Sequence, residues 1–174
     1  MKTAVMLVAL TFALSIAQAQ PLTITQVSAP SINCVYNLDC TVVVKDIADD
    51  LVLSNDTTIG SLQSRTVQGQ PLAPLVGLYG YEYRGKLQER EQNDPAPCLE
   101  TFTIDFDGAI VPFDYNGDGA SDDIYVITSG GLGTIAPVAA ERIGNRIVFH
   151  FPAPFVCAGD STFFFGFTST DPPA

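Results

Sequence analysis

Proline and glycine break this sequence into short segments, and their spacing constrains the fold more than any other feature. The 174 residues include 12 prolines and 14 glycines. Beyond the N-terminal segment, no run of about eleven or more residues carries a convincing helical period. The best helical candidate, residues 47–53, is short. The chain is therefore expected to consist of strands joined by turns.

Segments in which apolar or aromatic residues alternate with polar or small ones predict the strands. Gly144 and Asn145 predict a two-residue hairpin turn, because both residue types tolerate the positive φ that such turns require. The region 54–74 is rich in Ser, Thr, Gln, Gly and Pro and is expected to form a long loop or a pair of weak strands. The strong strands are predicted at residues 41–44, 78–84, 101–107, 123–128, 146–151 and 161–168.

The length and composition fit a single folded domain. Apolar residues make up 47% of the chain, which is enough material for a core. Many short strands with no internal repeat are typical of a sandwich rather than a propeller or solenoid. The sequence therefore predicts an all-β fold over residues 20–174, an antiparallel β-sandwich of roughly seven to nine strands.

The first nineteen residues have the pattern of a cleaved signal peptide. Lys2 gives a basic start, residues 4–16 are almost continuously apolar, and Ala17 and Ala19 place small residues before the expected cleavage between Ala19 and Gln20. The apolar run is shorter than the roughly 20 residues that a membrane-spanning helix needs. The mature protein is expected to be secreted, with no membrane insertion after cleavage.

The four cysteines all lie in the predicted mature chain. In an oxidising compartment they are expected to form two disulfides, for which three pairings are possible. The short spacing between Cys34 and Cys40 favours a local bridge, which leaves Cys98 to pair with Cys157. A zinc site is the alternative, but the sequence has no C-x-x-C and only one His.

The charge of the chain excludes one class of partner. Asp and Glu number 19 against 8 Lys and Arg, for a formal net charge of -11. Binding to a nucleic acid or to an anionic membrane surface requires cations that neutralise phosphates. We therefore expect no nucleic-acid partner.

One acidic segment has the spacing of a calcium loop. Oxygen-bearing side chains occur at its positions 1, 3, 5 and 9, with Gly119 at position 6 for a sharp turn and a backbone carbonyl after it. Calcium takes six to eight oxygen ligands at about 2.3–2.6 Å, and a coiling loop presents alternate side chains inward. The predicted ligands are Asp114, Asn116, Asp118, Ala120 through its carbonyl, and Asp122.

The same segment departs from the EF-hand. Position 12, where an EF-hand has a bidentate Glu, is Tyr125, and apolar strand residues flank the loop on both sides. A helix-loop-helix is therefore not expected. An acidic Asn-Gly and Asp-Gly turn without metal is the alternative interpretation.

Residues 113–127 resemble the D-x-N-x-D-G-x-x-D calcium loops of integrin-type and related bacterial extracellular repeats, and they are similar over nine positions to dockerin loops. The resemblance implies calcium and carries over the five ligands named above. Dockerins have two such loops with helices and a later acid, so cohesin binding is not implied. The signal peptide and the aromatic segment 162–167 more loosely resemble secreted bacterial surface proteins.

No catalytic signature is present. The sequence has one His and no G-x-S-x-G, and the glycine-rich segment 129–133 lacks the Lys of a phosphate-binding loop. Asp105 and Asp107 share one face of a predicted strand and could act as paired carboxylates, although a solvated face is the simpler interpretation. Glu82 alternates with tyrosines, which is typical of an exposed strand face of mixed charge.

Two functions are compatible with these features. The first is a secreted, calcium- and disulfide-stabilised structural or adhesion-type module without catalytic activity, whose partner is an unidentified extracellular protein or glycan. The second is a secreted carbohydrate-binding or glycoside-hydrolase-like domain that uses Asp105, Asp107 or Glu82. A concave cleft lined by two acids and a tyrosine would favour the second.

Overall fold

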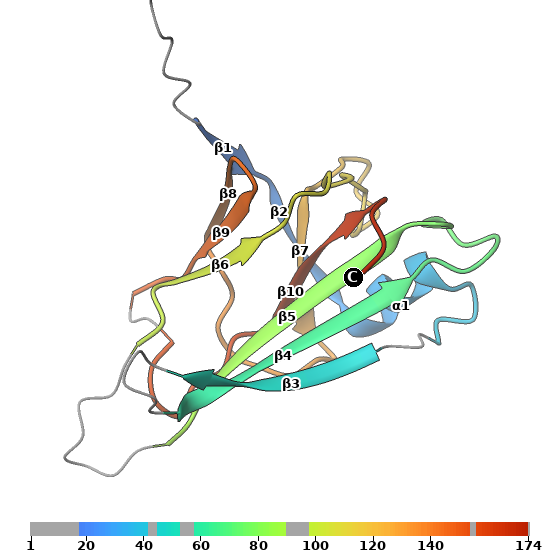
Figure 1. Ribbon diagram of the computed structural model, residues 1–174. Coiled ribbons are helices and arrows are strands. Elements are labelled where there is room, and N and C mark those ends of the chain that lie inside the picture. Colours follow the sequence, from blue (N-terminus) through green and yellow to red (C-terminus); the bar gives the residue numbers. More distant parts are fainter. Residues whose placement is uncertain (1–17, 42–44, 53–57, 90–97, 154–155, 174) are drawn as a thin grey trace, which may run out of the picture.

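The fold is a β-sandwich of two packed sheets with one short helix (Figure 1). The computed structural model describes residues 18–41, 45–52, 58–89, 98–153 and 156–173. These ranges contain ten strands and one helix, which confirms the predicted fold class. The elements are β1 (Ala19–Leu22), β2 (Ile24–Ser28), α1 (Ala29–Tyr36), β3 (Lys45–Val52), β4 (Thr58–Gln68), β5 (Tyr79–Leu87), β6 (Thr101–Asp105), β7 (Ile124–Ser129), β8 (Ala139–Ile143), β9 (Arg146–His150) and β10 (Phe164–Ser169).

The two sheets differ in size and in strand direction. The small sheet has the order β1-β8-β9-β6 and is antiparallel. The large sheet has the order β2-β7-β10-β5-β4-β3, and its β2–β7 pair is parallel. The antiparallel prediction is therefore wrong for this pair. Because β2 and β7 are far apart in the chain, no hairpin forces them to run in opposite directions.

Several predicted strands are confirmed. The alternating segments at 78–84, 101–107, 123–128, 146–151 and 161–168 correspond to β5, β6, β7, β9 and β10. Gly144 and Asn145 form the turn between β8 and β9, and Gly144 has a φ of 62°. The expected strand at 41–44 lies mostly outside the described residues.

Three elements differ from the expectations. The helical candidate at 47–53 lies mostly in β3, and the region 54–74 contains β4, which has 11 residues. The helix is α1 instead. It begins where the Ser28 hydroxyl accepts a hydrogen bond from the Ser31 amide and a proline follows in the first turn. Ile32 and Tyr36, four residues apart, are its buried side chains.

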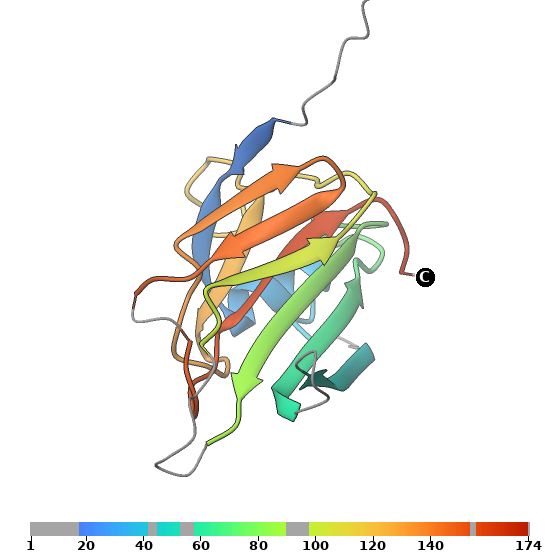
Figure 2. The ribbon, with the colours of Figure 1, turned by 60° about the vertical axis from the view of Figure 1, so that its left-hand side comes forward.

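Two apolar cores lie on opposite faces of the large sheet. One fills the space between the sheets and includes Phe149, Phe165 and Phe167. The other lies between the large sheet and α1 and includes Ile32 and Phe164. Figure 2 shows the resulting layers, with the small sheet in front of the large one and α1 behind it. All six residues of β10 are buried, because this strand lies between both cores.

Both expected disulfides are confirmed. Cys34 in α1 pairs with Cys40, and Cys98 pairs with Cys157. No free cysteine occurs among the described residues. The predicted cleavage site lies at the start of β1, whose first residue is Ala19. Cleavage there stays a prediction, and it would leave residues 20–22 of this strand.

The two disulfides should contribute unequally to stability. Their sequence separations are 6 and 59 residues, and a bridge that closes a longer loop restricts the unfolded chain more. We expect replacement of Cys98 and Cys157 by Ser to lower the free energy of unfolding by about 4 kcal/mol. The matched replacement of Cys34 and Cys40 should cost about 2 kcal/mol. Urea unfolding of both double variants measures the difference, and equal losses would contradict the loop-closure explanation.

Candidate functional site

The predicted calcium loop is a closed coil that ends directly before β7. Phe113 and Asp122 exchange two backbone hydrogen bonds, each 3.0 Å long, and so join the two ends of the loop. Gly117 and Gly119 have φ values of 78° and 92°, in the left-handed region that glycine adopts without strain. The two glycines therefore let the intervening backbone turn back on itself.

The coil surrounds the Asp114 carboxylate. Asp114 Oδ1 accepts hydrogen bonds from the amides of Gly117 at 2.8 Å and Asp118 at 3.0 Å. Asp114 Oδ2 accepts a third from the amide of Gly119 at 2.9 Å. The backbone thus bends around the first of the predicted ligands.

Asn116 and Asp118 continue this network. Asp118 Oδ1 accepts a hydrogen bond from the Ala120 amide, and its Oδ2 accepts one from Asn116 Nδ2, both at 2.8 Å. These two bonds, the first above all, lower the pKa of Asp118 below its ordinary value. The fully exposed Asp118 is therefore an anion at neutral pH.

The structure connects the predicted ligands by hydrogen bonds but does not gather their carboxylates at one point. Asp114, Asn116 and Asp118 share one network, Ala120 enters it through its amide, and Asp122 closes the loop with its backbone. Among the described residues, no three His, Cys, Asp or Glu side chains lie close enough together to hold a metal ion.

The loop is fastened to the parallel strand pair. Asn116 Nδ2 donates to the hydroxyl of the buried Thr25 at 2.9 Å. Asp123 Oδ2 accepts from the Thr23 amide at 2.8 Å and from its hydroxyl at 3.0 Å. Sequence reasoning missed Asp123 and both threonines, because nothing in the sequence indicates that β2 lies beside β7.

A second cluster of hydrogen-bonded polar side chains lies beneath α1 and consists of Glu82, Tyr125, Tyr36 and Thr168. Glu82 is only 7% exposed, so the interpretation of Glu82 as an exposed strand residue is wrong. The Tyr125 hydroxyl donates to Glu82 Oε1 at 3.2 Å, and the Tyr36 hydroxyl lies 3.5 Å from that of Tyr125 and 2.8 Å from that of Thr168. Burial raises the pKa of Glu82, although Arg65 and the Tyr125 hydrogen bond oppose the shift.

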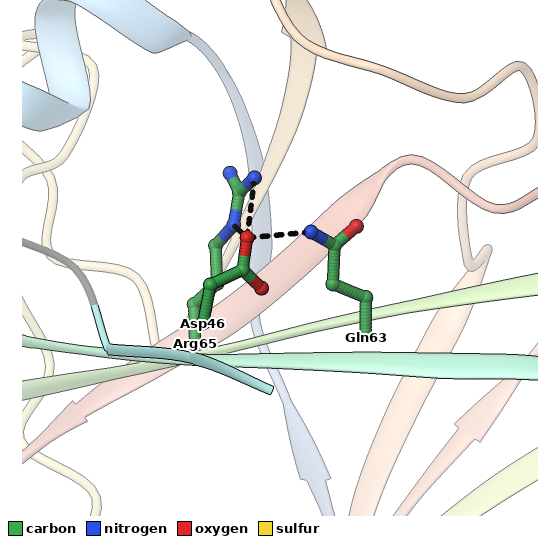
Figure 3. Close-up of polar contacts among 3 residues, drawn as sticks. All are labelled: Asp46, Gln63 and Arg65. Carbon is green, nitrogen blue, oxygen red and sulfur yellow. Dashed lines mark hydrogen bonds and ion pairs between the residues drawn. The ribbon is translucent and has the colours of Figure 1, made fainter. Parts of the chain in front are cut away.

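Arg65 is the cross-strand partner of Glu82, and Asp46 is the partner of Arg65 on its other side. Figure 3 shows Arg65 and Asp46 together with Gln63. Arg65 directs Nε and Nη2 to Asp46 Oδ2, each at 3.2 Å, and Gln63 donates to the same oxygen at 2.7 Å. The Arg65 guanidinium also lies 4.0 Å above the ring of Phe164. A pocket of about 260 Å³ lies among Glu82, Arg65, Phe164, α1 and the turn after β7.

A wider cleft opens on the other face of the large sheet. It lies beside β6, which is an edge strand of the small sheet. Its volume is about 630 Å³. Asp105 and Asp107 are both exposed, as their shared strand face predicted, and both line the cleft. Tyr81 and Tyr83 line it from β5, and the Tyr81 hydroxyl donates to the backbone oxygen of Asp171 at 2.7 Å. The cleft is therefore concave and contains acids and tyrosines together.

Comparisons with protein-family models, with curated proteins and with solved structures find no significant match for this chain. No helix within the described residues is long and apolar enough to cross a membrane.

Glu82 should make the folded state less stable at high pH. Its pKa is raised by burial, so the folded state binds the proton more tightly than the unfolded state. The stability that this tighter proton binding adds is fully present below the ordinary glutamate pKa of about 4.3. It is lost as the pH rises through the pKa of Glu82 in the folded state. We expect urea unfolding between pH 4 and pH 8 to show that Glu82→Gln gains stability relative to the wild type as pH rises.

The exposed Glu100 provides the matched control. Glu100→Gln should keep the wild-type dependence of stability on pH. If Glu82→Gln keeps it as well, folding does not raise the pKa of Glu82.

Proposed function

We propose that the protein is exported and acts as a calcium- and disulfide-stabilised extracellular structural or adhesion-type module without catalytic activity. The all-β fold and the two disulfides are compatible with a secreted module. The observation that carries the calcium part is the closed coil of backbone around Asp114.

The donor chemistry of the loop fits a hard cation. Carboxylate, amide and carbonyl oxygens are the ligands that calcium prefers, and its flexible geometry tolerates irregular sites. Asp114 is already oriented by three amides, and the Asn116 and Asp118 side chains are next to it in the same network. Coordination would require Asp118 and Asp122 to turn toward Asp114, with the Ala120 carbonyl as the backbone ligand.

A bound cation would offset the repulsion among the three carboxylates and would fix the loop against Thr23 and Thr25. Because both threonines belong to or adjoin β2, the ion would also stabilise the attachment of that strand to β7. In this proposal calcium supports a binding surface and performs no chemistry.

Calcium should raise the melting temperature of the wild-type protein. A ligand held only by the folded state adds about 2.7 kcal/mol at a hundredfold excess over its Kd. Asp118→Ala removes a central ligand, so it should abolish this gain. In the apo protein, relief of carboxylate repulsion opposes the loss of the hydrogen bonds from Ala120 and Asn116, so the net change in stability should be small. Thermal melts with millimolar calcium and with chelator measure both effects.

Asp50→Ala, an exposed acid on β3, is the control and should keep the calcium response. Magnesium should substitute poorly, because it demands a tighter octahedron and keeps its waters. Equal wild-type melting temperatures with calcium and with chelator, together with no calcium binding in equilibrium dialysis, would leave the metal-free acidic turn as the correct interpretation.

The cleft beside β6 favours carbohydrate binding as a second candidate function. Tyrosine rings offer an apolar face with a polar edge, and carboxylates accept hydrogen bonds from sugar hydroxyls. Asp105 and Asp107 supply exposed carboxylates, and the partly buried Tyr83 supplies a tyrosine in this cleft. The Tyr81 ring, in contrast, is buried against Phe106 and Phe167. Exposed carboxylates beside a tyrosine in a concave surface favour a carbohydrate-binding domain over a purely structural module.

Removal of the two cleft carboxylates should then weaken glycan binding. Each hydrogen bond to a charged group is worth about 1.5–3 kcal/mol, so Asp105→Asn with Asp107→Asn should reduce affinity by about tenfold or more. A glycan array identifies the ligand, and calorimetry measures the change. Asp49→Asn with Asp50→Asn on β3 is the matched control. A wild-type protein that binds no glycan would eliminate this function.

A further inference from the structure

The pocket beneath α1 is a built cavity between three parts of the fold. Its floor is the outer face of the large sheet, where Val67, Glu82 and Phe164 lie. α1 forms one wall and the turn at Gly130 to Leu132 forms another. Its volume of about 260 Å³ is slightly below the usual range of about 300–1,000 Å³ for ligand pockets. The cavity therefore suits a small molecule.

Among the described residues, Glu82 forms no ion pair. The Tyr125 hydroxyl is the only group among the described residues that hydrogen-bonds to its carboxyl. Arg65 is the cross-strand neighbour of Glu82 in the sheet and could pair with it. Arg65 instead directs two nitrogens to Asp46, its cross-strand neighbour on β3 (Figure 3). A buried carboxylate without an ion pair is costly, and a ligand ammonium would supply the missing donor.

Arg65 in turn determines what else the ligand must carry. Its Nε and Nη2 are used by Asp46, and Nη1 has no partner within the described part of the chain. A simple amine beside Glu82 would be repelled by this guanidinium. A carboxylate on the same ligand would remove the repulsion and would accept a hydrogen bond from Nη1.

Most of the remaining lining is apolar, and Asn33 and Tyr36 of α1 are its polar members. Val67, Ile127, Leu132 and Phe164 offer aliphatic and aromatic surface beside the two charged groups. Such a surface favours a ligand with a hydrocarbon side chain, because burial of apolar area is stabilising.

We propose that this pocket binds a free α-amino acid with an aliphatic side chain. The ammonium group pairs with Glu82, the carboxylate faces Arg65, and the side chain lies against Phe164 and Ile127. This site is on the opposite face of the large sheet from the cleft beside β6, and it depends neither on calcium nor on glycan binding.

The test compares three probes on the wild-type protein with both disulfides formed. L-leucine carries both charged groups, 4-methylpentanoate lacks the ammonium, and 3-methylbutylamine lacks the carboxylate. Isothermal titration calorimetry should show that L-leucine binds and that each analogue binds at least about tenfold more weakly, as the loss of one charged contact implies. Absence of L-leucine binding at millimolar concentration, or equal affinity for all three probes, would overturn the proposal.

Glu82→Gln tests the assignment of the ammonium contact. The variant keeps the size of the side chain and an acceptor for Tyr125, but it removes the negative charge. It should bind L-leucine no better than it binds 4-methylpentanoate, whereas Glu100→Gln should keep the wild-type preference. A Glu82→Gln protein that still prefers L-leucine tenfold would assign the contact elsewhere and overturn the proposed site. If this variant does not fold, the comparison of probes on the wild type decides alone.

Discussion

Burial of β10 on both of its faces is the constraint on which the rest of the structure depends. Phe165 and Phe167 point into the core between the sheets, and Phe164 points into the core under α1. A strand between two apolar layers has no access to water, so its backbone must be paired along both edges. β5 and β7 provide this pairing. The positions of Glu82 and Tyr125, one on each neighbour, are thereby fixed.

Gly166 allows those two residues to meet across β10. It is the register partner of both Glu82 and Tyr125, and it places no side chain between them. A Cβ atom added to Gly166 would lie 3.1 Å from the Tyr125 hydroxyl and 2.2 Å from a backbone oxygen of Tyr81. The hydrogen bond from Tyr125 to Glu82 therefore depends on a residue that contributes no atom to it. A polar group can persist between two apolar layers here because the central strand leaves room for it.

Sequence reasoning succeeded where the signal was local. Alternation located β5, β6, β7, β9 and β10, and spacing together with the export signal identified both disulfides. It missed α1 because an eight-residue helix with two buried residues is too short to show a helical period, although Ser28 before Pro30 is a usable start signal. It also misplaced Glu82, since an alternating strand reads as half-exposed unless a helix is known to cover its polar face. The cleft could not be predicted for a similar reason, because it brings β4 and β5 together with the end of β6 and with residues that follow β6 and β10.

The acidic loop and the pocket beneath α1 have a common support in the β2–β7 pair. Asn116 of the loop hydrogen-bonds to Thr25, and Thr25 is the register partner of Tyr125. Tyr125 in turn bonds to Glu82 in the pocket. Only one strand pair therefore separates a loop at the surface from a buried carboxyl.

Because β2 is a sheet edge paired on one side only, its attachment relies on β7, on the packing of Val27 and on the loop contacts through Thr23 and Thr25. A displacement of β2 would therefore disturb the loop and the pocket together.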